Sequence, residues 1–266
     1  MKMESPTDKL VARKEGAIGW IVFNQPQKHN AVSYEMWQAL PVLLDLFAKD
    51  EEVRVVILKG EGEKAFISGA DISQFGEKRS STEAILEYNA ASDRASMALQ
   101  EFPKPILAMI KGYCIGGGVA VAVGCDVRIA ADDTRYSIPA GKLGLGYRFS
   151  GVKRLTDFVG PSFTAEIFFT ARQFNAQEAL QMGLVNRVVP AVELERYTMD
   201  YANTIAGNAP LTLISIKRSL IEWHKDPANR DLAFAQKLVD DCYASEDYKE
   251  GRTAFMEKRK PQFRGH

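Results

Sequence analysis

The alternation of short apolar runs with helical patterns constrains the fold of this chain more than any other feature. Between the runs lie segments with the periodicity of amphipathic helices. Parallel strands need a long crossover connection, so strands that alternate with helices favour βαβ units. The sequence therefore predicts an α/β fold with a largely parallel sheet. The expected buried strands are Ile18 to Phe23, Val53 to Leu58, Pro105 to Ile110 and Val127 to Ala130.

Two helices carry recognisable start and stop signals. Ser33 can cap a helix that Pro41 should kink. Asn175 and Glu178 have the spacing of a capping box, and Gly183 can end the short helix that they begin. The apolar face of the first helix consists of Met36, Trp37, Leu40, Leu43, Leu44 and Phe47.

The last third of the chain differs from the rest. A final strand is expected from Val185 to Val189, and the pattern after Pro190 is helical, with breaks at Pro210 and Pro227. We therefore expect a core over residues 1–205 and a C-terminal helical region over residues 206–266.

Charge and hydropathy exclude several classes of protein. The 266 residues include 34 basic and 34 acidic side chains, so the formal net charge is zero. A neutral chain has no electrostatic basis for binding nucleic acid or an anionic membrane surface. No apolar run has the length of a membrane span, and the polar N-terminus lacks the apolar segment of a signal peptide. These features predict a cytoplasmic protein.

The cysteines and histidines predict neither a metal site nor a hydrolase triad. The cysteine spacings match no metal-binding or disulfide framework, so buried, reduced thiols are expected. No histidine lies in the glycine-rich central stretch, which argues against Ser-His-Asp chemistry and against a histidine-ligated metal. The residues concerned are Cys114, Cys125 and Cys242, with His29, His224 and His266.

Two glycine-containing segments each follow a buried strand. They are Phe66-Ile67-Ser68-Gly69-Ala70-Asp71-Ile72 and Lys111-Gly112-Tyr113-Cys114-Ile115-Gly116-Gly117-Gly118-Val119-Ala120. The second leads into an apolar helix, so its glycine amides lie at a helix N-terminus, where unpaired donors meet a positive field. Such amides suit a developing negative charge. Each segment alone could equally be a tight turn. Neither contains a nucleotide-binding or nucleophile-elbow motif.

Together and in this order, the segments resemble the crotonase superfamily of enoyl-CoA hydratases and isomerases. The resemblance covers nearly the whole chain. It implies a ββα spiral core and a C-terminal helical region that forms a homotrimer or a dimer of trimers. Further matching segments are Pro26-Gln27-Lys28-His29-Asn30-Ala31, Phe168-Phe169-Thr170-Ala171, Ala176-Gln177-Glu178-Ala179, Gly183-Leu184-Val185-Asn186 and Phe255-Met256-Glu257-Lys258-Arg259-Lys260-Pro261.

The resemblance also implies a site for an acyl-CoA thioester, with no cofactor beyond that substrate. The amides of Ala70 and Gly117 would form an oxyanion hole for the thioester oxygen. From its position after Ala70 alone, Asp71 is expected to anchor the loop rather than move protons. The residues that the resemblance assigns to CoA binding are Lys28, Ala31, Ser68 and Ile72 through the backbone, and Phe255 and Lys258 from a neighbouring subunit.

The sequence departs from the hydratase pattern at both catalytic carboxylates. Hydratases of this superfamily place one glutamate where this chain has Ala120 and another where it has Ala140. Hydration needs one group to activate water and another to protonate the α-carbon, and a methyl group does neither. The oxyanion hole would remain, but efficient water addition is not expected.

The segment 143–149 resembles the corresponding loop of methylmalonyl-CoA decarboxylases, which makes Tyr147 a candidate catalytic residue. Loss of CO₂ generates the enolate directly and needs no strong base. Arg148 or Lys142 could attract the substrate carboxylate, but an inward-pointing arginine would stabilise the ground state and slow the reaction. One departure concerns Ala70, where that branch has a histidine.

The sequence thus predicts a lyase of this superfamily and leaves the reaction open. Decarboxylation of a malonyl-type CoA and hydration by non-standard proton-transfer groups are both compatible with it. A non-catalytic acyl-CoA-binding protein would keep the same contacts without the proton-transfer groups. A CoA thioesterase would need a base or nucleophile near the carbonyl, and the sequence offers no clear one.

Overall fold

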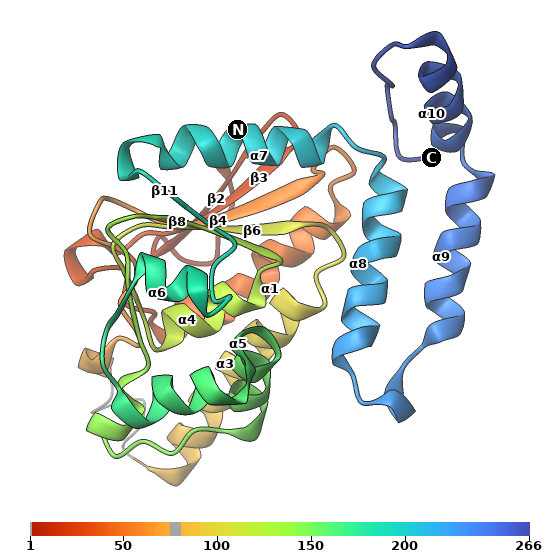
Figure 1. The fold of residues 1–266 in the computed structure, drawn as a ribbon. Helices are drawn as coiled ribbons and strands as arrows, with labels where there is room; N and C mark the ends of the chain where they lie inside the picture. The colour runs from red at the N-terminus through yellow and green to blue at the C-terminus, as the bar shows by residue number, and fades with distance from the viewer. Residues whose placement is uncertain (1, 75–80) are drawn as a thin grey trace.

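A long, mostly parallel sheet runs through the core of the protein (Figure 1). The structure is a computed structural model and describes residues 2–74 and 81–266. Within these residues, β1 pairs antiparallel with β2 and β2 pairs antiparallel with β3, and every later pairing in the sheet is parallel. The α/β prediction is confirmed. In spatial order the strands are β1 (Lys2–Met3), β2 (Leu10–Glu15), β3 (Ile18–Phe23), β4 (Val55–Gly60), β6 (Ile106–Ile110), β8 (Val127–Ala131) and β11 (Arg187–Val189).

A smaller sheet lies beside the carboxyl ends of the central strands and brings the two glycine segments together. Its strands β5, β7 and β9 are parallel, with Ala65 opposite Tyr113 and Ile67 opposite Cys114. Parallel neighbours end at the same edge, so the residues after β5 and β7 become neighbours. In spatial order the strands are β10 (Phe174–Asn175), β9 (Arg135–Ser137), β7 (Tyr113–Ile115) and β5 (Ala65–Ile67).

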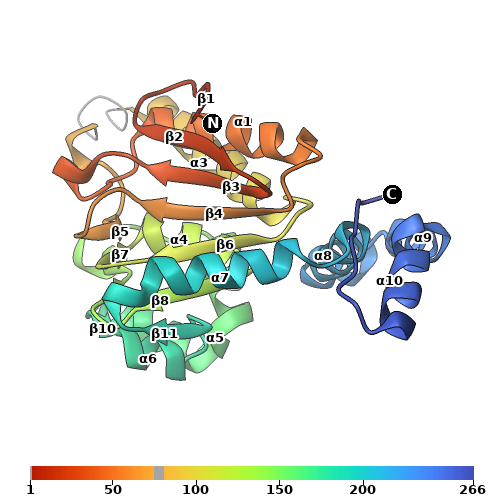
Figure 2. The ribbon, with the colours of Figure 1, turned by 90° about the horizontal axis from the view of Figure 1, so that it is seen from above.

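Helices cover both faces of the large sheet, and each face has its own apolar core. The main core packs the sheet against α1 (Tyr34–Lys49), α3 (Thr82–Gln100), α4 (Gly117–Gly124) and α5 (Phe149–Thr170). The second core lies under α7 (Leu194–Ala206), which crosses β4, β6 and β8 (Figure 2). Short elements complete the core: α6 (Ala176–Gln181), η1 (Pro26–Lys28), η2 (Ile72–Gln74), η3 (Pro139–Lys142) and η4 (Ala191–Glu193).

The predicted start and stop of α6 are confirmed. The Glu178 amide donates to Asn175 Oδ1 at 2.9 Å, and the Asn175 amide donates to Glu178 Oε2 at 2.8 Å. Gly183 then adopts a φ of 78°, which glycine tolerates without strain. The strand expected from residue 185 begins at Arg187 instead, because the Val185 amide donates to the carbonyl of Ala179 in α6 and is not available to a neighbouring strand.

The first helix and the second parallel strand differ slightly from expectation. Ser33 is the N-cap residue of α1, as predicted, and the helix runs on through Pro41 to Lys49. The strand expected from Val53 begins at Val55, because the Val53 amide closes a turn on the Asp50 carbonyl at 3.1 Å.

The C-terminal helices stand beside the core as a separate layer (Figures 1 and 2). Arg54 of the core donates to the Ala206 and Phe263 carbonyls, and Lys217 of α8 forms an ion pair with Asp126 at 2.5 Å. The division into 1–205 and 206–266 stays a prediction about folding units. Among the described residues, no helix combines the length and apolar character of a membrane span. The elements are α8 (Pro210–His224), η5 (Pro227–Asn229), α9 (Leu232–Ala244) and α10 (Glu246–Glu257).

Candidate active site

The centre of the candidate site is the meeting point of the two glycine segments. Gly69 has a φ of 118° and Gly116 a φ of 53°, so both turns use conformations that favour glycine. A Cβ built on Gly117 would lie 3.9 Å from the Gly69 carbonyl carbon. The peptide that carries the Ala70 amide therefore lies directly beside the first residue of α4.

The amides of Ala70 and Gly117 are unused within the described part of the chain. The Val32 amide donates to the Gly69 carbonyl, and the Asp71 amide donates to the Val32 carbonyl. These two bonds flank Ala70, so the Ala70 amide takes no part in the pairing with Val32. Gly117 is the first residue of α4, and no hydrogen bond of the described residues engages its amide. Two adjacent free donors, one at the positive end of a helix, can donate hydrogen bonds to a developing oxyanion.

Asp71 anchors this segment, as the sequence indicated. Its carboxylate accepts hydrogen bonds from Lys28 Nζ at 2.8 Å and from the Ser73 amide and hydroxyl at 3.1 and 2.6 Å. Burial opposes ionisation, but the bonds from Lys28 and Ser73 outweigh it and hold the pKa of Asp71 below its usual value. The carboxylate is therefore charged and fully occupied within the protein, which suits an anchor better than a proton carrier.

Four of the predicted CoA-binding residues gather at this edge. The Ala31 amide donates to the Lys28 carbonyl, and the Ser68 hydroxyl reaches the same carbonyl at 3.4 Å. Ile72 follows the anchored Asp71 and is 71% exposed. Their contact with CoA stays a prediction, but the fold brings these residues together from segments forty positions apart.

Phe255 and Lys258 are not brought to the site by their own chain. Phe255 lies on α10 with its side chain 82% exposed, and Lys258 is the C-cap of that helix. Figure 1 shows α10 at the upper end of α9, well away from α4, which follows the second glycine segment. If these residues cover bound CoA, they must belong to another copy of the chain.

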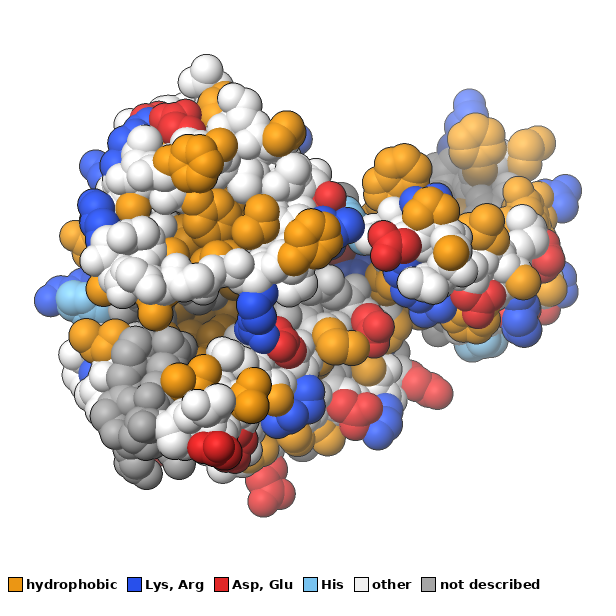
Figure 3. Space-filling view, turned by 90° about the horizontal axis from the view of Figure 1, so that it is seen from below, with side chains coloured by type: hydrophobic (Ala, Val, Ile, Leu, Met, Phe, Trp, Pro, Cys, Tyr) orange, Lys and Arg blue, Asp and Glu red, His pale blue; other side chains and the backbone are white. Residues whose placement is uncertain are grey.

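The loop that carries Tyr147 leads into α5, and the ring of Tyr147 packs on that helix. Its ring packs edge-on against Phe168, with centroids 4.6 Å apart, and against Gly151. Tyr147 is 39% exposed, yet burial of its phenol raises the pKa above the usual value, so the hydroxyl stays protonated. Figure 1 places this loop and α3 at the lower end of the core, and Figure 3 shows that end with apolar side chains around a recess.

The two basic residues of the loop face outward. Arg148 forms an ion pair with Asp93 of α3, and both side chains are about half exposed. Lys142 is exposed on η3. The structure therefore places neither the Arg148 guanidinium nor the Lys142 ammonium inside the candidate site.

Ala120 and Ala140 occupy the positions where hydratases carry glutamates. Ala120 lies in the first turn of α4, and Ala140 lies in η3 with only 8% of its surface exposed. Cys114 lies nearby on β7, but it is fully buried and burial strongly raises the pKa of its thiol. This cysteine is a packing residue, as expected.

Sequence reasoning missed the part played by Trp37. We assigned it to the apolar face of α1, where it is indeed buried, but its ring also lies beside Gly117. A Cβ on Gly117 would lie 3.4 Å from Trp37 Cζ2, and Trp37 Nε1 donates to the Tyr88 hydroxyl at 3.0 Å. Helical spacing predicts which face is buried but not which buried ring borders the second glycine segment.

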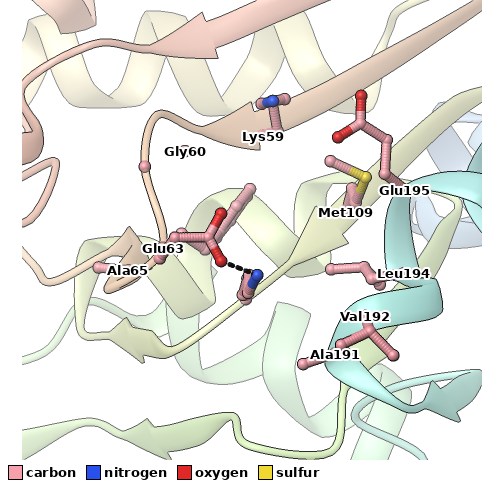
Figure 4. Close-up of a pocket in the computed structure, with 12 residues that line it drawn as sticks. Lys59, Gly60, Glu63, Ala65, Met109, Ala191, Val192, Leu194 and Glu195 are labelled. Atoms are coloured by element: carbon pink, nitrogen blue, oxygen red, sulfur yellow. Dashed lines mark hydrogen bonds and ion pairs between the residues drawn. The ribbon is translucent and has the colours of Figure 1, made fainter.

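A separate cavity of about 190 Å³ lies on the α7 side of the large sheet (Figure 4). Lys111 pairs with Glu63 there, and Lys59 and Glu195 also line it. Its positive and negative side chains are equal in number, and it includes none of the predicted site residues. Among the described residues, no cluster of histidine, cysteine, aspartate or glutamate could hold a metal ion.

Comparisons with known proteins identify the family of the chain. The family model for enoyl-CoA hydratase/isomerase matches residues 13–266, so the chain belongs to that family. A short-chain-enoyl-CoA hydratase of Clostridium acetobutylicum is 34% identical over 95% of this chain and 96% of its own. A crotonyl-CoA hydratase of Syntrophomonas wolfei is 32% identical over 96% and 98% of the two chains.

Solved structures show the same fold. An enoyl-CoA hydratase/carnithine racemase from Magnetospirillum magneticum superposes with a TM-score of 0.90 at 33% identity, over 97% of this chain and 96% of that one. An enoyl-CoA hydratase from Bacillus anthracis gives 0.87 at 28% identity, over 97% and 100%. The predicted crotonase-like core with C-terminal helices is thereby confirmed.

Proposed function

We propose that the chain binds an acyl-CoA thioester and stabilises its enolate between the amides of Ala70 and Gly117. The pair of adjacent, unused amides carries this proposal. As the enolate forms, negative charge develops on the thioester oxygen, and fixed donors stabilise that charge without reorganising. Loss of one such donor typically costs roughly 3–4 kcal/mol of transition-state stabilisation.

The reaction that fits the remaining residues best is decarboxylation of a malonyl-type CoA. The bond between the α-carbon and the carboxylate breaks, CO₂ leaves, and the electron pair enters the enolate. The α-carbon then takes one proton, which the neutral phenol of Tyr147 or water can supply. No base is needed at Ala120 or Ala140, and the reaction uses no cofactor beyond the CoA thioester itself.

The position of Arg148 supports this reaction. A free arginine beside the substrate carboxylate would stabilise the ground state more than the transition state, since the carboxylate loses its charge as CO₂ forms. Here the ion pair with Asp93 occupies the guanidinium. Tyr147 can then orient the carboxylate without holding it back.

Hydration is the second candidate, and the names of the two curated relatives favour it. It would require other groups in place of the missing glutamates, with Tyr147 and an ordered water as the available pair. The apolar methyls of Ala120 and Ala140 make this the weaker mechanism.

We also propose that CoA is held by the backbone around Lys28, Ala31, Ser68 and Ile72, with Phe255 and Lys258 supplied by a neighbouring copy. A homotrimer or dimer of trimers would bring these groups together.

The C-terminal helices expose apolar side chains that such an interface would cover. Light scattering at micromolar concentration should give a trimer or hexamer, and a monomer would contradict this arrangement. The exposed residues include Leu220, Trp223, Leu232 and Phe234.

A mass-spectrometric screen with crotonyl-, methylmalonyl- and ethylmalonyl-CoA tests the reaction. Loss of CO₂ from either malonyl-type substrate is the expected result. Addition of water to crotonyl-CoA alone would establish hydration instead, and release of free CoA would indicate a thioesterase. Binding without any turnover would identify an acyl-CoA-binding protein.

Calorimetry with acetyl-CoA should show micromolar affinity, about −8 kcal/mol. Absence of binding at millimolar ligand would overturn the whole proposal.

A further inference from the structure

The far end of α4 is bound by two arginines. Arg154 Nε donates to the Val123 carbonyl at 3.0 Å, and Arg128 Nη1 donates to the Cys125 carbonyl at 2.8 Å. These carbonyls belong to the last turn and C-cap of a helix that begins at Gly117. Eight residues make a helix about 12 Å long, so both cations lie one short helix away from the proposed oxyanion hole.

Arg128 is buried and Arg154 is partly buried, and both are bound to backbone carbonyls. Arg128 is 2% exposed, and its Nε also donates to the Leu184 carbonyl at 2.7 Å. The guanidinium carbons of Arg128 and Arg154 lie 4.4 and 4.8 Å from the ring centre of Phe158. Burial lowers the pKa of Arg128 to about 10 and lowers that of Arg154, but both remain charged at neutral pH.

The nearest carboxylates are already paired with other cations. Asp126 directly follows the C-cap; it accepts the Ile106 amide at 2.8 Å and the Lys217 ammonium at 2.5 Å. Lys217 is 5% exposed, so this pair is largely shielded from water. Asp157 is bound by Lys153. Asp126 also attracts both arginines and Asp157 attracts Arg154, but each carboxylate is shared with a lysine, so the two guanidinium charges at the helix end are only partly offset.

We propose that Arg154, assisted by Arg128, is a positioning residue for the oxyanion hole and acts through α4. A helix has a negative C-terminus that partly offsets the attraction of its positive N-terminus for an anion. Two cations bound to the C-terminal carbonyls neutralise that negative end. The amide of Gly117 then meets the developing oxyanion in a more positive field than an eight-residue helix alone supplies. This inference rests on the proposed oxyanion function.

The test compares two ligands on the full-length protein. One is a CoA thioether with a nitroalkane in place of the acyl group, whose nitronate form carries negative charge on oxygen. The other is the matching neutral ketone. Arg154→Gln retains a donor for the Val123 carbonyl but removes the charge, and Arg154→Lys keeps the charge. Arg172→Met is the control, because Arg172 also stacks on a phenylalanine but donates to Gln173 and Glu166 instead of to the end of α4.

Arg154→Gln should weaken nitronate binding about 3- to 10-fold, with ketone binding within 2-fold of wild type. Arg154→Lys should retain most of the nitronate affinity, and Arg172→Met should change neither ligand. Lys217→Met, which leaves Asp126 uncompensated beside the same helix end, should lower the nitronate preference too and serves if the glutamine variant does not fold. Equal weakening of both ligands, or none, would overturn the inference while leaving the oxyanion hole intact. A wild-type protein with no preference for the nitronate would overturn the proposed function, and the inference with it.

Discussion

The two glycine segments and the loop that carries Tyr147 are built in opposite ways. Around the oxyanion segments, backbone meets backbone: a Cβ on Gly118 would lie 2.4 Å from the Ile67 carbonyl oxygen. Around the Tyr147 loop, Gly144 and Gly146 have no neighbouring atom within 4 Å of an added Cβ, and residues 141–150 are all exposed. The segments proposed to stabilise the thioester oxygen are fixed by packing, whereas the loop proposed to select the reaction is open to change.

The ion pairs of the two regions show the same contrast. Asp71 is nearly buried and has three hydrogen-bond donors, including Lys28. The Arg148–Asp93 pair is half exposed on both partners. Exposed pairs contribute little to stability, so the second pair matters mainly through where it holds the charge.

Gly118→Ala should have the largest effect, because its methyl group would push β5 away from α4. We expect turnover to fall about 100-fold, since an ångström of misplacement costs about that much. Stability should fall by about 1–3 kcal/mol. Gly146→Ala, in the open loop, is the matched control and should change neither quantity. Assays of malonyl-type CoA turnover and thermal melting measure both; equal effects of the two variants would remove the contrast.

Ala120→Glu combined with Ala140→Glu should raise hydration of crotonyl-CoA by roughly 10-fold over a poor wild-type rate. A well-placed acid–base group contributes about 10²–10⁴-fold, and the gain is smaller here because the loop was not shaped to orient a carboxylate. Burial of Glu at position 140 also carries a desolvation cost. The assay is the loss of enoyl-thioester absorbance. Wild-type turnover near that of ordinary hydratases would show that another group already moves the protons.

Asp93→Asn should lower kcat for a malonyl-type CoA by about 3-fold and lower KM with it. The freed Arg148 can then pair with the substrate carboxylate and stabilise the ground state. The double variant Asp93→Asn, Arg148→Gln should restore wild-type kinetics. Steady-state assays at low and high salt provide the measurement. An unchanged kcat in Asp93→Asn would mean that Arg148 does not reach the substrate.

Lys28→Met should have the smallest effect, a loss of about 1 kcal/mol at neutral pH. The folded-state pKa of Asp71 lies below its usual 3.8, so its charge stabilises the fold above that pH, and this contribution is lost as pH falls through the folded-state pKa. The melting difference between wild type and variant, roughly 2–4 °C at pH 7, should therefore shrink below pH 4. Lys49→Met, which breaks an exposed pair on α1, is the control. A difference that persists at low pH would contradict the role of the Asp71 charge.

Local signals in the sequence identified most of the core because they depend on neighbours in the chain. Buried strands such as Ile18–Phe23 and the Asn175–Glu178 capping box need no information about distant residues. The ends of strands were less predictable. Val53 and Val185 are β-branched residues typical of strands, but their amides form other hydrogen bonds. The Val53 amide donates to the Asp50 carbonyl in a turn, and the Val185 amide donates to the Ala179 carbonyl at the end of α6.

The candidate site was predictable where backbone chemistry defines it and unpredictable where side chains meet across the fold. The sequence of the second glycine segment predicted unpaired amides at the N-terminus of a helix, which is α4. The pairing of Arg148 with Asp93, the contact of Trp37 with Gly117 and the arginines behind α4 all join residues far apart in sequence. No periodicity or motif encodes such contacts, since they depend on how helices pack.

The burial of two cysteines has a practical consequence for measuring thioester cleavage. Thiol reagents that detect released CoA react with thiolates, and burial raises the pKa of Cys125 to about 12 and strongly raises that of Cys114. Cys242 alone among the three is partly accessible. A colorimetric assay on the folded protein should therefore carry a background of about one equivalent per chain, and a Cys242→Ser protein would give a nearly blank baseline.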